Sequence, residues 1–345
     1  MLKRRTKIKA ISIGFFILSI VLVLKVARSI IFAENSLQKL RRVVISTEKN
    51  SFSDVSYKMF DENGESVSLK SSKIKEVNKN TLNFKKVELT FRISPDEMGN
   101  ITADRSTATN EQKVHKSAFF GNVVLSTEKG LTLRSEESFV DFDAQTAKGN
   151  KPISITQKCV QMNASKYDFD MAAKIMTLIG HVNGKINSDK ISADTLVAEF
   201  ENRIGQDLKK ITATGNSSYK TPKYELSAQD KLVYTSTEVL ANKHVFLHYQ
   251  DKVKSYKVHS DNMVILLKGS QVDRVKAKGH VKIESKDVKI KGESGDLVGD
   301  LLTISDNVFI NSDRGNIICE KATLNLKTNE VRVLKSKGVV SFNRK

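Results

Sequence analysis

Apolar and polar residues alternate along the chain from about residue 52 to its end. This alternation with a period of two predicts β-strands that have one apolar, buried face and one polar, hydrated face. A helical period of 3.6 is rare after residue 45. The best helix candidate, YDFDMAAKIMTLIG at 167–180, fits a strand equally well. The pattern therefore predicts an all-β protein; examples of the alternation are LTFRIS, GLTLRSE, HVFLHYQ and VKIESKDVKIKG.

A short motif recurs within this alternation. It consists of Gly or another turn residue, then usually Asn or His, then Val or a polar residue. Gly, Asn and Asp adopt positive φ angles more readily than other residues, so we expect these positions to form turns. The motif occurs as GNV at Gly121, GHV at Gly180, GNS at Gly215, KHV at Lys243, GHV at Gly279, DNV at Asp306 and, weakly, GVV at Gly338.

A second motif lies between the copies of the first. Together the two motifs define units of about 30 residues, which matches two or three ordinary strands with their turns. One such unit cannot bury its apolar face alone, so we predict that the units stack into an elongated body with open end strands. Unpaired end strands can be extended by a strand of another protein. The second motif occurs as ISADTLV, LSAQDKLV, VHSDNMV and IKGESGDLV, with an earlier ITAD at 101–104.

The N-terminal segment has a different character. The apolar run AISIGFFILSIVLVL at 10–24 follows five cationic residues, and residues 8–33 together are long enough to cross a bilayer. Lys25 and Arg28 can extend toward the interface. A cleaved signal peptide is the alternative, but Ile31 fits poorly two positions before Ala33. We expect an uncleaved signal anchor, with the N-terminus in the cytoplasm and the bulk of the chain exported.

The positive charge is concentrated near this anchor. The formal net charge is +18, from 57 Lys and Arg and 39 Asp and Glu, and residues 1–42 carry ten cations and one acid. A basic end beside an apolar run favours a membrane surface. A nucleic-acid-binding protein more often concentrates its charge on the folded part, so we expect no nucleic-acid partner.

The sequence offers little for catalysis or metal binding. His244 and His248 are four residues apart, which on a strand separates them by about 13 Å, too far to share one ion. The acid pairs Asp141/Asp143 and Asp168/Asp170 have a spacing compatible with acid–base chemistry, but half-solvated strands show the same pattern. Cys159 and Cys319 form neither a disulfide framework nor a zinc pattern. No nucleophile or phosphate-binding motif occurs. We predict that the protein is not an enzyme and needs no cofactor.

Residues 99–155 resemble the lipopolysaccharide export protein family LptC. The matching features are ITAD, then GNVVLSTEKGLTLRSE, then an aspartate-bearing strand and a KPI segment, all after one signal anchor. The later ISADTLV and GHV units are similar to the OstA-type repeats of LptA, the periplasmic bridge protein. The resemblance covers about residues 50–345, whereas LptC-like proteins usually end after one domain. The length therefore suggests an extended LptC–LptA form.

The resemblance implies a fold, a location and partners. It implies an open β-jellyroll of stacked short antiparallel strands, anchored in the inner membrane by a single pass, whose apolar interior binds lipopolysaccharide acyl chains. It implies transfer from an inner-membrane ABC transporter toward a downstream periplasmic bridge or outer-membrane translocon, which contacts the chain by strand augmentation. The expected domains are a cytoplasmic stub and anchor at 1–34, a linker at 35–50, an LptC-like jellyroll at 51–188 and an LptA-like repeat region at 189–345.

Apolar residues on one strand face are the candidates for lining a lipid groove. Burying an acyl chain there contributes about 0.8 kcal/mol per methylene group. The alternative is a structural or adhesive β-solenoid whose core is closed and filled by side chains, with no lipid ligand. The candidate lining residues are Leu131, Leu133, Ile191, Ala193, Val197, Val281, Ile283, Val308 and Ile310.

Overall fold

The computed structural model describes residues 51–336, with short gaps at 62–63, 79, 95–96, 112–113, 129, 142–143, 145, 158–159, 171, 202–207, 251–254, 269–270, 287, 313–314 and 329. This part of the chain is built from antiparallel β-strands, which confirms the all-β prediction. Within these ranges, no helix is long and apolar enough to span a membrane. The predicted anchor at 8–33, the linker at 35–50 and the motif at Gly338 lie outside the described residues.

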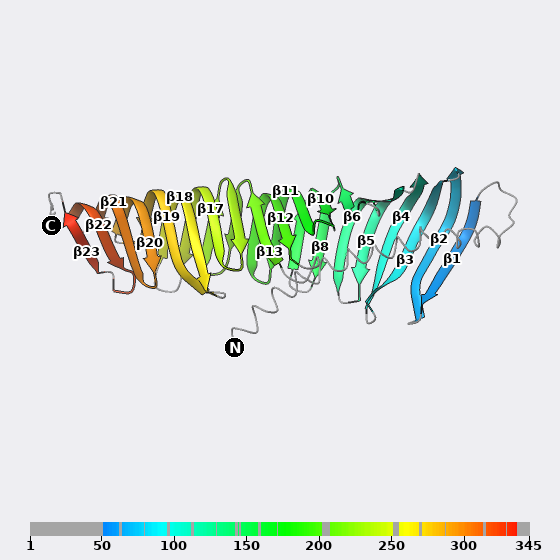
Figure 1. The fold of residues 1–345 in the computed structure, drawn as a ribbon, viewed down its shortest axis with the longest axis horizontal. Helices are drawn as coiled ribbons and strands as arrows, with labels where there is room; N and C mark the ends of the chain where they lie inside the picture. The colour runs from blue at the N-terminus through cyan, green and yellow to red at the C-terminus, as the bar shows by residue number, and fades with distance from the viewer. Residues whose placement is uncertain are drawn as a thin grey trace. The chain divides into compact units, whose positions relative to one another are not determined.

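The chain divides into two compact units, the first comprising Met1–Gly184 and Val197–Leu208 and the second comprising Lys185–Leu196 and Lys209–Lys345. Most strands of the first unit are labelled in Figure 1. They are β1 (Ser51–Asp61), β2 (Gly64–Asn78), β3 (Thr81–Ser94), β4 (Glu97–Glu111), β5 (Val114–Thr127), β6 (Leu131–Asp141), β7 (Thr146–Gly149), β8 (Ile153–Gln157), β9 (Val160–Ala164), β10 (Lys166–Asp170) and β11 (Ile175–Ile186).

Consecutive strands of the first unit pair with one another from β1 to β6. After β6, the next two strand positions are each occupied by two short strands in line, β7 with β8 and then β10 with β9. β6 therefore pairs with both β7 and β8. β8 then pairs with β9, and β7 pairs with β10, which pairs with β11.

The second unit continues the same architecture. β12 (Asp189–Phe200) contributes its first part to this unit. From β17 to β23, each strand pairs with the next. The remaining strands are β13 (Leu208–Thr214), β14 (Ser217–Lys220), β15 (Tyr224–Ala228), β16 (Lys231–Thr235), β17 (Glu238–Gln250), β18 (Ser255–Lys268), β19 (Gln271–Glu284), β20 (Val288–Val298), β21 (Leu301–Ser312), β22 (Gly315–Asn325) and β23 (Val331–Ser336).

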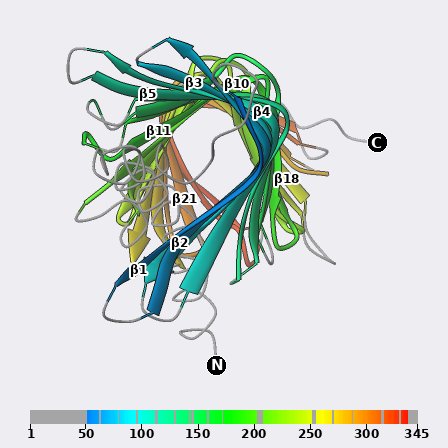
Figure 2. The same ribbon diagram turned by 90° about the vertical axis from the view of Figure 1, so that its right-hand side faces the viewer.

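The recurring motif marks bends inside the strands. At all six described copies, two consecutive residues have positive φ, as at Gly279 (78°) and His280 (47°). The prediction of positive φ is thus confirmed. The assignment to turns between strands is wrong at five copies, which lie inside strands, whereas Gly215 and Asn216 lie between β13 and β14. In β19 the two residues lie in mid-strand, where the pairing register with β20 shifts between Lys278 and Val281. Two left-handed residues redirect the chain while hydrogen bonding continues on both sides, so the strands are bent in the view of Figure 2. One 30-residue unit accordingly consists of two long, bent strands.

The second motif supplies the partner at three of the four described glycine bends. The strand before the bend carries an aspartate beside the glycine, and a Cβ added to Gly279 would lie 2.3 Å from Oδ2 of Asp261. The same relation joins Gly121 to Asp104 and Gly215 to Asp194. The residue after the glycine can then bond to this carboxylate, as His280 does through Nδ1 at 2.8 Å. The two motifs recur together because they are the two halves of one bend; the other described side-chain bond of this kind joins Asn122 Nδ2 to Asp104 Oδ2 at 2.9 Å.

The contact between His280 and Asp261 predicts a measurable titration shift. The hydrogen bond to Asp261, followed by the charges of Asp261 and Glu293, raises the pKa of the exposed His280 imidazole. The raised pKa means that this contact stabilises the fold below the unfolded-state pKa of histidine and is lost as the pH rises through the folded-state value. We expect NMR titration to give His280 a pKa above that of a free histidine. Asp261→Asn should lower it toward the free value; an unchanged pKa in that variant would contradict the assigned cause.

Candidate functional site

The second unit has an apolar inner face that is closely packed. Val308 and Ile310 on β21, and Val281 and Ile283 on β19, are 0–4% exposed and belong to one core cluster with Ala193. Five of the nine predicted lining residues therefore lie together on the buried face of the second unit. Sequence inspection missed equally buried members of this cluster that follow the same alternation, namely Met263, Ile290 and Ile304.

The other predicted lining residues lie in different surroundings. Ile191 and Val197 on β12 are half-buried, and Val197 lies between the buried Leu196 and Ala198. Leu133 on β6 is half-buried and lines a cavity in the first unit. Leu131 begins β6, where its backbone pairs with Gln157.

The first unit contains a small apolar cavity of about 70 Å³. This volume is well below the roughly 300–1,000 Å³ of ordinary small-ligand pockets, so a long acyl chain enters only if the surrounding side chains move apart. Its lining includes Leu133, Phe119, Val140, Ile153, Tyr167 and Phe169.

Tyr167 supplies the polar atom beside this cavity. Its hydroxyl donates a hydrogen bond to the backbone carbonyl oxygen of Glu137 at 3.1 Å. Burial, which outweighs an opposing hydrogen bond with Ser138, raises the pKa of Tyr167 to about 12. The hydroxyl therefore stays neutral at physiological pH, which is the form that an apolar cavity accommodates.

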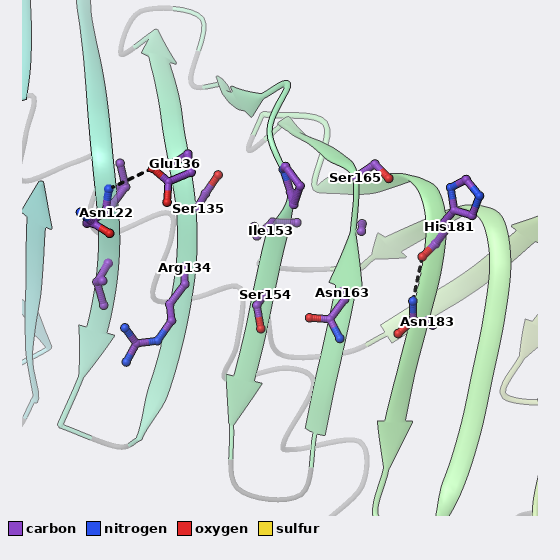
Figure 3. Close-up of a pocket in the computed structure, with 14 residues that line it drawn as sticks. Asn122, Arg134, Ser135, Glu136, Ile153, Ser154, Asn163, Ser165, His181 and Asn183 are labelled. Atoms are coloured by element: carbon purple, nitrogen blue, oxygen red, sulfur yellow. Dashed lines mark hydrogen bonds between the residues drawn. The ribbon is translucent and has the colours of Figure 1, made fainter.

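A larger groove, lined by both polar and apolar side chains, crosses the same unit on β5, β6, β8, β9 and β11 (Figure 3). Its volume is about 530 Å³, and its lining is rich in amide and hydroxyl side chains. Val123, Arg134, Ser135 and Ile153 line both this groove and the apolar cavity, so the two spaces share a wall. The polar lining comprises Asn122, Arg134, Ser135, Glu136, Ser154, Asn163, Ser165, His181 and Asn183.

Two of the acids considered for catalysis have structural partners, while Asp143 and Cys159 lie outside the described residues. The Asp141 carboxylate accepts the backbone N–H of Ala144 at 2.9 Å, and Asp170 accepts that of Ala173 at 2.7 Å. Cys319 is buried and free, and burial raises the pKa of its thiol. Over residues 51–336, gaps excepted, no group of three or more His, Cys, Asp or Glu side chains is placed to hold a metal ion. Asp141 and Asp170 therefore act in turns, and Cys319 packs in the core.

These features define a repeat-built antiparallel β-protein with a buried apolar face and a polar outer groove. Residues 18–187 match the family model described as lipopolysaccharide-assembly, LptC-related. This part of the chain is thus an LptC-related region, which confirms the resemblance to LptC. The family is one of lipopolysaccharide assembly and not a catalytic one.

Two further comparisons give less. No curated protein sequence matches the chain significantly. The crystal structure of LptH, described as the LptA-homologous periplasmic component of the conserved lipopolysaccharide transport device from Pseudomonas aeruginosa, is 13% identical. The match covers 54% of this chain and 89% of that chain, with a TM-score of 0.21. At that score the family assignment rests on the LptC match, and the LptA-like nature of the later repeats stays a prediction.

Proposed function

We propose that this protein is a non-enzymatic, membrane-anchored component of a periplasmic lipopolysaccharide bridge. The observation that carries the proposal is the LptC-related match over residues 18–187, in a chain whose strands present a continuous apolar face within each unit. The acyl chains of the lipid would lie against this face and the saccharide would lie outside it. The anchor at 8–33 would hold the chain at the inner membrane, with the bulk in the periplasm and the domains divided as the sequence predicts.

Transport of lipid along the chain needs energy from a partner, because the sequence contains no nucleotide-binding motif. An inner-membrane ABC transporter is the proposed source of both lipid and energy. A downstream periplasmic bridge or outer-membrane translocon would receive the lipid, joined to the chain by strand augmentation at a sheet edge. No nucleic-acid partner and no cofactor are part of this proposal.

The nine predicted residues are the proposed lipid-lining set, with the buried members of the second unit exposed when the sheet faces separate. A photo-crosslinking amino acid at Leu133, Val281 or Ile283 should then capture lipopolysaccharide in the full-length protein. The same group at the polar alternates Thr132 and Lys282 should capture little. Capture only from the polar alternates would contradict the assignment of the inner face.

The close packing of the second unit favours a second candidate function. Val308 is fully buried and Met263 and Ile304 are 1% exposed, which is also how a closed structural β-solenoid packs. The two candidate functions differ in whether lipid copurifies with the protein when it is extracted from its membrane. Mass spectrometry of the purified full-length protein should find lipid A if it carries lipid; its consistent absence, with no crosslinks, would favour the solenoid.

A further inference from the structure

The groove of Figure 3 departs from the repeat in a way that leaves polar side chains unused. At two of the other three described glycine bends, the residue after the glycine bonds to an aspartate of the preceding strand, as Asn122 and His280 do. At the bend of Gly180 and His181, the neighbouring side chain is Ser165, whose Cβ would lie 2.9 Å from a Cβ added to Gly180. A serine replaces the aspartate, so the His181 imidazole makes no side-chain bond with any described residue. Figure 3 shows it at the β11 end of the groove.

The rest of the groove contains further polar groups without partners. Among the described residues, the side chains of Arg134, Ser154 and Asn163 make no hydrogen bond or ion pair, and neither does the Ser165 hydroxyl. Arg134 and Asn163 are exposed, and in register Arg134 pairs with Ser154 and Ser154 with Asn163. The three form a row across β6, β8 and β9. β9 also pairs with β11, which carries His181. Three interstrand spacings separate β6 from β11, about 14 Å.

The chemistry of this lining suits a neutral ligand with many hydroxyl groups. Amide, hydroxyl, imidazole and guanidinium groups offer donors and acceptors in several directions. The cation Arg134 is offset by the acid Glu136, which already accepts the backbone N–H of Asn122 at 3.4 Å. The groove therefore has no excess positive charge to select an anion. Its volume of about 530 Å³ lies within the usual range for small-ligand pockets, roughly 300–1,000 Å³.

We propose that this groove is a saccharide-binding site on the first unit. Arg134 and His181 would bind hydroxyl oxygens at the two ends of the groove, and Ser154 and Asn163 would bind those between them. The inference deepens the proposed function and rests on it for one point, the source of the sugar. Because the groove shares a wall with the apolar cavity, the saccharide of a bound glycolipid is the favoured source, and a free oligosaccharide is the alternative.

Isothermal titration calorimetry on the full-length protein in detergent micelles tests this site. The probes are deacylated lipopolysaccharide, the free disaccharide chitobiose and inorganic phosphate. Arg134→Gln should weaken saccharide binding by about tenfold, the scale of one hydrogen bond to a charged group. His181→Asn should also weaken saccharide binding, because it removes the imidazole. The variant should still fold, since Asn122 occupies the same bend position in another strand.

The matched controls are Arg105→Gln, an exposed arginine on β4 outside the groove, and His280→Asn, the same bend position in the second unit. Both should leave saccharide binding unchanged. Binding of deacylated lipopolysaccharide would support the site, with a glycolipid as the source of the sugar. Binding of chitobiose but not of deacylated lipopolysaccharide would support the site, with a free glycan as the source of the sugar.

Three results would overturn the inference: no binding of either saccharide, equal weakening by test and control variants, or phosphate binding as tight as saccharide binding. Lipid capture from Leu133 in the Arg134→Gln protein separates this failure from failure of the proposed function. If capture persists while the groove binds no saccharide, only the groove assignment is wrong. If capture is also absent, the transport proposal fails as well.

Discussion

Gly279→Ala is expected to destabilise the second unit by about 1.5–3.5 kcal/mol. Part of the cost arises because Gly279 has a φ of 78°, where an L-residue costs about 1–2 kcal/mol. The rest arises because the new methyl group would lie 2.3 Å from Oδ2 and 3.0 Å from Cβ of Asp261. Asp261 must then leave its position, which costs about 0.5–1.5 kcal/mol if its side chain moves off a favoured rotamer. The measurement is the urea midpoint of the full-length protein, followed by circular dichroism.

Gly299→Ala is the matched control for this prediction. Gly299 lies in the same unit and also has a positive φ, 58°, but nothing lies within 4 Å of an added Cβ. Gly299→Ala should therefore reduce folding stability only by the cost of a side chain at positive φ, about 1–2 kcal/mol. In an Asp261→Ala background, Gly279→Ala should cost less than it does alone, because two of the three close contacts are gone. Equal losses at both glycines would show that the contact with Asp261 is unimportant.

The bend chemistry is the part of the fold that the sequence predicts best. Positive φ depends mainly on local residue types. The repeated Gly-Asn and Gly-His pairs therefore predict it without knowledge of the neighbouring strands. KHV at Lys243 and DNV at Asp306 were recognisable only by their position in the repeat, yet both have the same two-residue conformation. What the local pattern does not contain is whether such a pair ends a strand or bends it. That outcome depends on pairing with strands on both sides.

Which residues of a strand face the core is harder to predict, because this also depends on pairing with the strands on both sides. In strands that carry the positive-φ pair, buried residues flank the bend four positions apart, as with Leu178 and Val182. In the partner strands they are three positions apart, as with Ala193 and Leu196. A strict period of two, extended from Ala193 through the bend, leads to Val197, which is only half-buried. The alternation is therefore reliable within each half-strand and is reset at each aspartate.

The groove could not be predicted from the sequence, because it depends on the absence of a bend aspartate as a partner for His181. His181 occupies the same motif as His280, and both were interpreted as turn residues. Only the neighbouring strand distinguishes them, with Ser165 beside one bend and Asp261 beside the other. The signal in the sequence is the absence of an aspartate-bearing second motif before Gly180. Its meaning becomes visible once β9 and β11 are known to be neighbours.

Leu302→Asp is expected to unfold the second unit or to destabilise it by at least about 4 kcal/mol. Leu302 is 7% exposed and opposes Leu324 of β22, another buried member of the core. The substitution removes about 1.5–3 kcal/mol of apolar burial and places a carboxylate without a partner in the core. The urea midpoint and the circular dichroism spectrum of the full-length protein measure the loss.

Leu301→Asp is the matched control, because it makes the same chemical change one residue earlier in β21. Leu301 is 49% exposed and opposes Asn325, so its carboxylate stays hydrated and the expected loss is within about 1 kcal/mol. Comparable losses at both positions would contradict the assignment of the buried face. The pair also bears on the lipid proposal, because Leu302 is on the same strand and the same buried face as Val308 and Ile310. A large loss at Leu302 therefore means that lipid reaches these residues only by displacing the packing that holds the unit together.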